Sequence, residues 1–74
     1  MTNQKKTNAV QFGQYGIVLE KEQLAYYLNG ELFQVRDVNH EFNFDDLYNL
    51  ALRIATKKDI TSVHYVTKFD IIGK

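Results

Sequence analysis

Two histidines and a group of nearby carboxylates are the side chains best suited to metal binding or acid–base chemistry in this 74-residue chain. His40-Glu41 stands shortly before Asp45-Asp46, so a loop and the first turn of a following helix could bring them around a zinc ion or a harder cation. A simpler interpretation is stronger, because two aspartates at a helix start complement its positive end and His40 then lies in the preceding loop. We therefore predict no metal site and no cofactor.

Catalysis by a nucleophile needs a base and an orienting group within reach of it, and His40 and His64 are the candidate bases. His64 precedes Tyr65 in a segment of strand-like composition, where a histidine without a spaced partner is more typical of a packing or surface residue. The sequence contains no nucleophile elbow, phosphate-binding glycine loop, zinc-binding helix motif or calcium loop. We predict that the chain is not an enzyme.

Aromatic and apolar residues outside the predicted core are the better candidates for function. Tyr27 and Leu32 are expected to oppose each other on the side of a hairpin that faces away from the core, with Arg36 beside them. Tyr48 and Leu52 lie at or beyond the margin of the apolar stripe of a predicted helix. Tyr and Arg on accessible apolar surface are typical interface anchors. We predict that the chain binds another protein or a second copy of itself, as a homodimer, through Tyr27, Leu32, Arg36, Tyr48 and Leu52.

Charge and composition suggest what kind of partner this is. The net charge is zero, but residues 17–46 hold seven acidic and two basic residues, whereas residues 47–74 hold five basic and two acidic ones. An acidic stretch can orient docking on a basic cleft of another protein. Residues with AT-rich codons (Phe, Tyr, Met, Ile, Asn and Lys) number 29, against 10 for Gly, Ala, Arg and Pro. These features favour an inhibitor or regulator from a phage or mobile element.

A nucleic-acid-binding accessory protein is the alternative function. Bases stack on Tyr and Phe when basic residues follow the phosphate backbone. The chain has scattered basic residues that could supply this charge, but the predicted aromatic surface lies in the acidic part of the sequence and the domain is neutral. We rank this function second. The basic candidates are Lys5, Lys6, Arg36, Lys57, Lys58 and Lys68.

The elements that position these residues start from Asn29-Gly30, which stands between two alternating apolar runs and predicts a hairpin with a two-residue type I′ turn. In that register Tyr26 faces Phe33 and Leu24 faces Val35. One face is then apolar and is expected to form the core: Leu24, Tyr26, Leu28, Phe33 and Val35. A short helix over Lys21–Asn29, ended by Gly30, is the competing interpretation. We prefer the strand because the apolar residues alternate.

The remaining elements complete an α+β fold. Residues 15–21 read as a strand, and Val10 and Phe12 as a short one before it. Asn43 is a suitable N-cap for a helix whose apolar stripe covers the hairpin and which ends at Asp59. Residues 60–65 and 69–72 are strand-like, with a turn at Thr67-Lys68. The predicted order is ββ(β)αβ(β): an antiparallel meander with one helix on one face.

Length and composition set the domain organisation. We predict a flexible tail over residues 1–8 and a single domain over residues 9–74. The absence of cysteine excludes disulfides and fits a reducing compartment. No apolar run approaches the length of a membrane span, and no secretory signal is visible at the start, so we expect a cytoplasmic protein without membrane contact.

Overall fold

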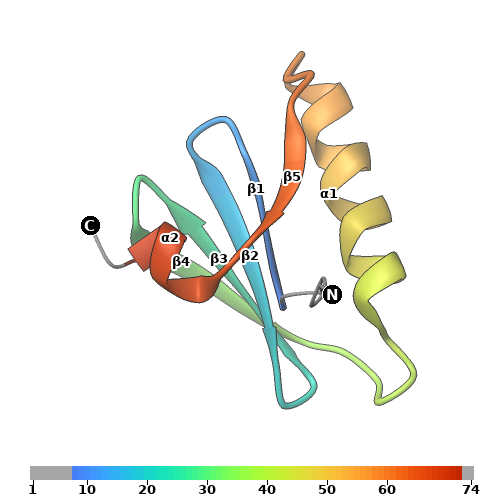
Figure 1. The fold of residues 1–74 in the computed structure, drawn as a ribbon. Helices are drawn as coiled ribbons and strands as arrows, with labels where there is room; N and C mark the ends of the chain where they lie inside the picture. The colour runs from blue at the N-terminus through green and yellow to red at the C-terminus, as the bar shows by residue number, and fades with distance from the viewer. Residues whose placement is uncertain (1–7, 73–74) are drawn as a thin grey trace, which may run out of the picture.

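The computed structural model describes residues 8–72, which form a sheet of five strands with two helices (Figure 1). The strands are β1 (Ala9–Phe12), β2 (Tyr15–Glu20), β3 (Gln23–Leu28), β4 (Glu31–Asp37) and β5 (Val63–Val66). The helices are α1 (Phe44–Lys57) and α2 (Lys68–Ile72). All neighbouring strands are antiparallel, in the order β4-β3-β2-β1-β5. The predicted α+β meander is confirmed, including the short first strand.

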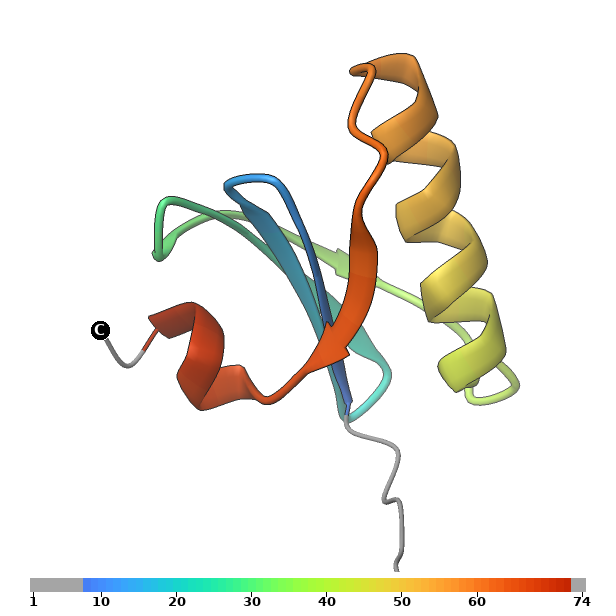
Figure 2. The ribbon, with the colours of Figure 1, turned by 45° about the horizontal axis from the view of Figure 1, so that its top comes forward.

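Two helices lie on opposite sides of the sheet, as Figure 2 shows. The long helix α1 packs mainly against β1, β5 and β2. The prediction of a strand over residues 69–72 is wrong, because Lys68–Ile72 form α2. The expectation of one helix on one face is also only partly right, since α2 covers part of the other face. We call the side that carries α1 the helix side and the other the outer side.

The hairpin of β3 and β4 turns at Asn29-Gly30, where both residues have positive φ, 54° and 83°. This is the predicted type I′ geometry, and β3 is a strand rather than the alternative helix. The pairs Leu28↔Glu31 and Tyr27↔Leu32 follow the predicted register, but a bulge then shifts the ladder so that Tyr26 pairs with Gln34. Phe33 is the extra residue of that bulge.

A second tight turn joins β2 to β3, and its two residues are not glycine. Lys21 and Glu22 have φ of 48° and 66°, and Glu20 pairs directly with Gln23. Side chains other than Gly and Asn pay about 1–2 kcal/mol for a left-handed backbone. The sequence gives no warning of this turn type, because Lys-Glu lacks the usual Asn-Gly signature.

Replacing this turn by Lys21→Asn with Glu22→Gly is expected to raise the free energy of unfolding by about 1 kcal/mol, since both residues then tolerate positive φ. The net charge is unchanged, and the gain would appear as a higher urea midpoint at constant slope. Gly30→Ala, at φ 83°, is the reverse control and should lower the midpoint. A double variant that is no more stable than the parent would show that the positive φ of Lys21 and Glu22 does not lower the stability of the fold.

Helix α1 starts where the sequence predicts. The Asn43 side chain accepts hydrogen bonds from the backbone N–H groups of Asp45 and Asp46 at 3.0 and 3.1 Å, and the Asp46 carboxylate accepts one from Asn43 N–H at 3.0 Å. This reciprocal arrangement is a capping box. At the other end Asp59 has φ 59°, and the N–H of Ile60 donates to the carbonyl of Ala55. A left-handed residue here ends the helix.

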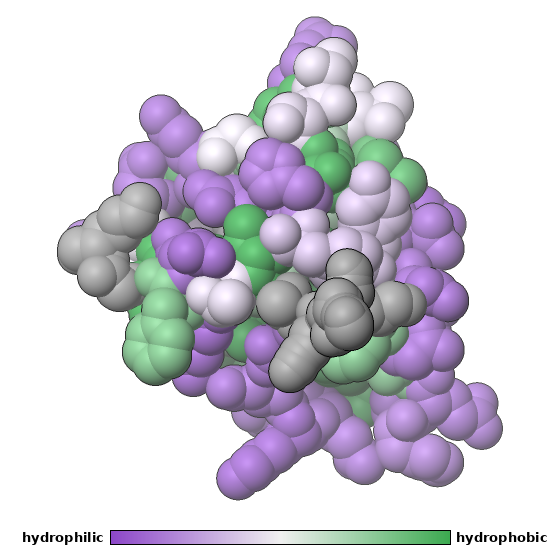
Figure 3. Space-filling view, viewed as in Figure 1, coloured by the Kyte–Doolittle hydropathy of each residue, from purple (hydrophilic) through white to green (hydrophobic). Residues whose placement is uncertain are grey.

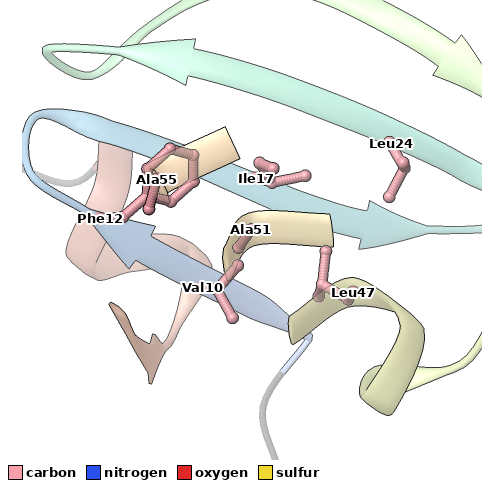
Figure 4. Close-up of a cluster of buried hydrophobic side chains, with 7 residues drawn as sticks. All are labelled: Val10, Phe12, Ile17, Leu24, Leu47, Ala51 and Ala55. Carbon is pink, nitrogen blue, oxygen red and sulfur yellow. The ribbon is translucent and has the colours of Figure 1, made fainter. Parts of the chain in front are cut away.

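The main core lies between α1 and the sheet (Figure 4). Leu47, Ala51 and Ala55 of α1 are fully buried against side chains from the first three strands. Small alanines let the helix approach the sheet closely, and the larger residues fill the space between them. The sheet side of this core consists of Val10, Phe12, Ile17 and Leu24.

A smaller core lies on the outer side, under α2. Ile71 packs there on Ala9 and Val18, with Tyr27 at its margin. Gly16 makes this contact possible, because a Cβ at that position would stand 2.7 Å from the end of the Ile71 side chain. The docking of α2 therefore depends on a glycine near the start of β2.

The predicted N-terminal tail over residues 1–8 falls outside the described residues except for its last residue, Asn8. Asn8 and Leu19 form two hydrogen bonds. Leu19 N–H donates to the Asn8 carbonyl at 2.8 Å, and the Asn8 side chain donates to the Leu19 carbonyl at 3.1 Å. Within residues 8–72, neither helix has the length and apolar character needed to cross a membrane.

Candidate functional site: the outer surface of the hairpin

The carboxylates and histidines singled out in the sequence do not converge. Asp46 caps α1, and His64 is an exposed residue of β5 opposite Gln11. Among the described residues, no three His, Asp or Glu side chains stand close enough together to hold a metal ion. The other residues singled out in the sequence are apolar and aromatic side chains of the hairpin and α1.

Two of the five predicted contact residues lie together. Tyr27 and Leu32 pair directly across the hairpin and share the outer side, as the register predicts. Leu32 is 53% exposed, whereas Tyr27 is half-buried because it packs against the core under α2. About half of Leu32 is thus available to a partner, and Tyr27 lies beside it on the neighbouring strand.

Arg36 lies on the other side of the sheet, and its predicted place beside Tyr27 and Leu32 is wrong. The bulge at Phe33 pairs Arg36 with Leu24 and Val35 with Ala25, which exchanges the sides of both β4 residues. The Arg36 guanidinium donates to the Tyr26 hydroxyl at 3.4 Å on the helix side. Val35, predicted in the core, is instead 49% exposed on the outer side. Compared with the predicted contact surface, the outer side therefore lacks the Arg36 guanidinium and carries the Val35 side chain in addition.

Tyr48, another predicted contact residue, is half-buried and contacts residues of its own chain. Its ring stacks on Tyr65 with centroids 5.2 Å apart, and its hydroxyl donates to the Val63 carbonyl at 3.2 Å. Tyr65 in turn donates to the Phe44 carbonyl at 3.2 Å. Partial burial raises the pKa of the Tyr65 phenol, and the charges of Asp45 and Tyr48 raise it further. This pair of tyrosines joins α1 to β5.

Leu52 stands apart from the other predicted contact residues. It is 40% exposed on α1, beside a shallow hollow that it shares with Asn49, Arg53, Thr56 and Lys57. Its neighbours are polar, and it lies on the opposite side of the sheet from Leu32. It provides a single exposed leucine rather than a patch.

Further exposed apolar side chains lie on α2, which packs on the same outer side of the sheet as Tyr27. Phe69 of α2 is 78% exposed and Ile72 is also exposed, and the backbone of Ile71 approaches the Asn29-Gly30 turn. In the space-filling view, hydrophobic residues show beside α2, with hydrophilic residues between and around them (Figure 3). Sequence reasoning missed three of the exposed apolar residues on the outer side, two because residues 69–72 were read as a strand. We call this set the outer patch: Tyr27, Leu32, Val35, Phe69 and Ile72.

Acidic residues border the outer patch at one end. Glu20, Gln23 and Asp37 pair across β2, β3 and β4 in the row next to Val18, Ala25 and Val35. The Lys68 ammonium stands 3.0 Å from the Glu20 carboxylate, and Gln23 donates to Asp37 at 3.2 Å. Glu20 is therefore neutralised locally by Lys68, and Asp37 retains its negative charge at the border.

The outer patch has the side chains needed to bind another molecule. Its five members are apolar or aromatic, and the side chains that border it offer carboxylate, amide and one ammonium group. Such a combination buries apolar area against a partner and orients it by charge. In comparisons with protein-family models, curated proteins and solved structures, nothing matches this chain.

Proposed function

We propose that this protein is a non-enzymatic interaction module that binds another protein, or a second copy of itself, through the outer patch. The observation that carries the proposal is the exposure of Leu32, Val35 and Phe69 on one side of the sheet. Exposed apolar side chains that gather in one place mark interaction sites far more often than single ones do.

The partner's chemistry follows from the border of the patch. Asp37 lies at its end, so a fitting partner carries apolar contact residues with a basic residue at one edge. A phosphate backbone fits poorly here, because Asp37 is acidic and Lys68 is paired with Glu20. Electrostatics thus supports a protein over a nucleic acid.

The wider biological role extends this proposal. The abundance of residues with AT-rich codons supports a source in a phage or mobile element of a low-GC bacterium. An acid-bordered apolar surface suits an inhibitor or regulator that docks on a basic cleft of a host protein. The partner is then expected among host proteins that bind nucleic acids.

The test compares three immobilised proteins in lysate of a low-GC bacterium: the parent, Leu32→Asp and Leu52→Asp. Both variants place a carboxylate at an exposed leucine, so nonspecific effects of the charge are matched. A true partner is retained by the parent and by Leu52→Asp and lost by Leu32→Asp. With the purified pair, calorimetry is expected to show at least about tenfold weaker binding for Leu32→Asp.

Light scattering after size-exclusion chromatography tests whether the partner is a second copy of the protein. A concentration-dependent doubling of mass that Leu32→Asp abolishes and Leu52→Asp preserves would identify the partner as the protein itself. The proposal fails if no retained protein and no self-association depends on Leu32. It also fails if the parent binds single-stranded DNA at low salt and Leu32→Asp does not weaken protein binding.

A further inference from the structure

An apolar groove of about 230 Å³ lies on the helix side of the sheet, between the end of α1 and the β3–β4 hairpin. It exists because α1 covers mainly β1, β2 and β5, whereas the hairpin continues past the helix. The bulge places the extra residue Phe33 at the far wall, where its ring centroid is 6.3 Å from that of Tyr26. The lining residues that matter here are Phe12, Tyr15, Tyr26, Phe33, Ile54 and Lys58.

The size of the groove fits one aromatic ring with a short substituent. An apolar cavity of about 150 Å³ in another protein is known to hold benzene. A volume of about 230 Å³ leaves room for a chain of a few atoms beyond such a ring. Aromatic walls suit this ligand, because rings pack on one another in stacked or tilted arrangements.

A single cation stands among the lining residues of the groove. The Lys58 ammonium lies 4.8 Å from the centroid of the Tyr15 ring, and within residues 8–72 the structure pairs it with no carboxylate. Glu31 pairs with Leu28 on the helix side of the hairpin. It is not among the residues that line the groove. Arg36, bonded to Tyr26, adds a second cation on this side. The charge around the groove therefore favours an anion.

We propose that the groove binds a small aromatic carboxylate. Its ring would lie between Phe33 and Ile54, and its carboxylate would accept a hydrogen bond from the Lys58 ammonium. A charged donor and acceptor give a stronger bond than a neutral pair. This site is on the side of the sheet opposite the outer patch, so it can be occupied independently of the proposed protein partner.

The test uses the full chain, labelled with ¹⁵N, and 3-phenylpropionate as the probe. Titration is expected to shift the amide signals of Tyr15, Phe33 and Ile54 saturably and to leave those of Leu32 and Val35 in place. The neutral analogue 3-phenylpropan-1-ol has the same ring and is expected to bind about fivefold more weakly, because it lacks the charge. Equal affinity for the two compounds would overturn the proposal.

Two lysine variants separate a specific contact from general surface charge. Lys58→Gln is expected to weaken 3-phenylpropionate about fivefold and to leave the affinity for the alcohol unchanged. Lys57→Gln is the matched control, because Lys57 borders the hollow beside Leu52 and not the groove. Circular dichroism would verify that both variants fold. The proposal is wrong if the two substitutions weaken the acid equally, or if no saturable shift occurs at the groove in the parent.

Discussion

Phe12→Ala is expected to lower the free energy of unfolding by about 3–5 kcal/mol. Phe12 is 1% exposed in the core between α1 and the sheet, and its ring stacks on Tyr15 with centroids 5.7 Å apart. Alanine would leave a cavity that the surrounding strands cannot fill without losing their pairing. At about 0.05–0.15 kcal/mol per residue, a domain of this length has little stability beyond that loss, so the variant is expected to be largely unfolded near body temperature.

Urea denaturation followed by circular dichroism measures this loss, and Phe33→Ala is the matched control. Phe33 belongs to the same sheet but is exposed on the edge strand β4. Its removal is expected to cost less than about 1 kcal/mol, since most of its ring already contacts solvent. Similar losses for both variants would mean that Phe12 is not part of the core between α1 and the sheet.

The parts of the fold that local chemistry specifies were predictable. Asn29-Gly30 has the residues that a type I′ turn requires, and Asn43 with Asp46 has those of a capping box. Each signal lies within four residues and acts on the local backbone. The β3–β4 hairpin and the start of α1 follow from them.

The bulge at Phe33 was not predictable from these signals. An extra residue in one strand leaves the alternation of apolar residues intact in sequence while reversing their sides in space. Val35 and Arg36 exchange sides for this reason. The predicted contact set loses Arg36 and gains Val35, so the candidate site changes in both charge and composition.

The sequence contains a helix-start signal for α2, although the residues that follow it are typical of a strand. Thr67 N–H donates to the Asp70 carboxylate at 2.9 Å, and Asp70 N–H donates to the Thr67 hydroxyl at 3.2 Å. Thr-x-x-Asp is the pattern of a capping box. The strand-like residues Phe69, Ile71 and Ile72 outweighed it, because a five-residue helix has little intrinsic stability. Docking of Ile71 beside Gly16 supplies the missing stability.

Ile71→Ala is therefore expected to lower the free energy of unfolding by about 2 kcal/mol, at the lower end for a buried isoleucine because the site lies at the margin of the protein. Ile72→Ala, the neighbouring and exposed residue, should cost far less. Urea denaturation measures both. Equal losses would show that α2 does not depend on this side chain.

A double-mutant cycle can assign the contact to Gly16. Gly16→Ala in the parent brings a Cβ to 2.7 Å from the Ile71 side chain, so it is expected to displace α2 and destabilise the fold. In the Ile71→Ala background that contact is gone, and the same substitution should be much less harmful. Additive losses would exclude direct coupling. A coupled result would mean that Gly16 and Ile71 together hold α2, with Phe69 and Ile72, on the side of the sheet that carries Leu32 and Val35.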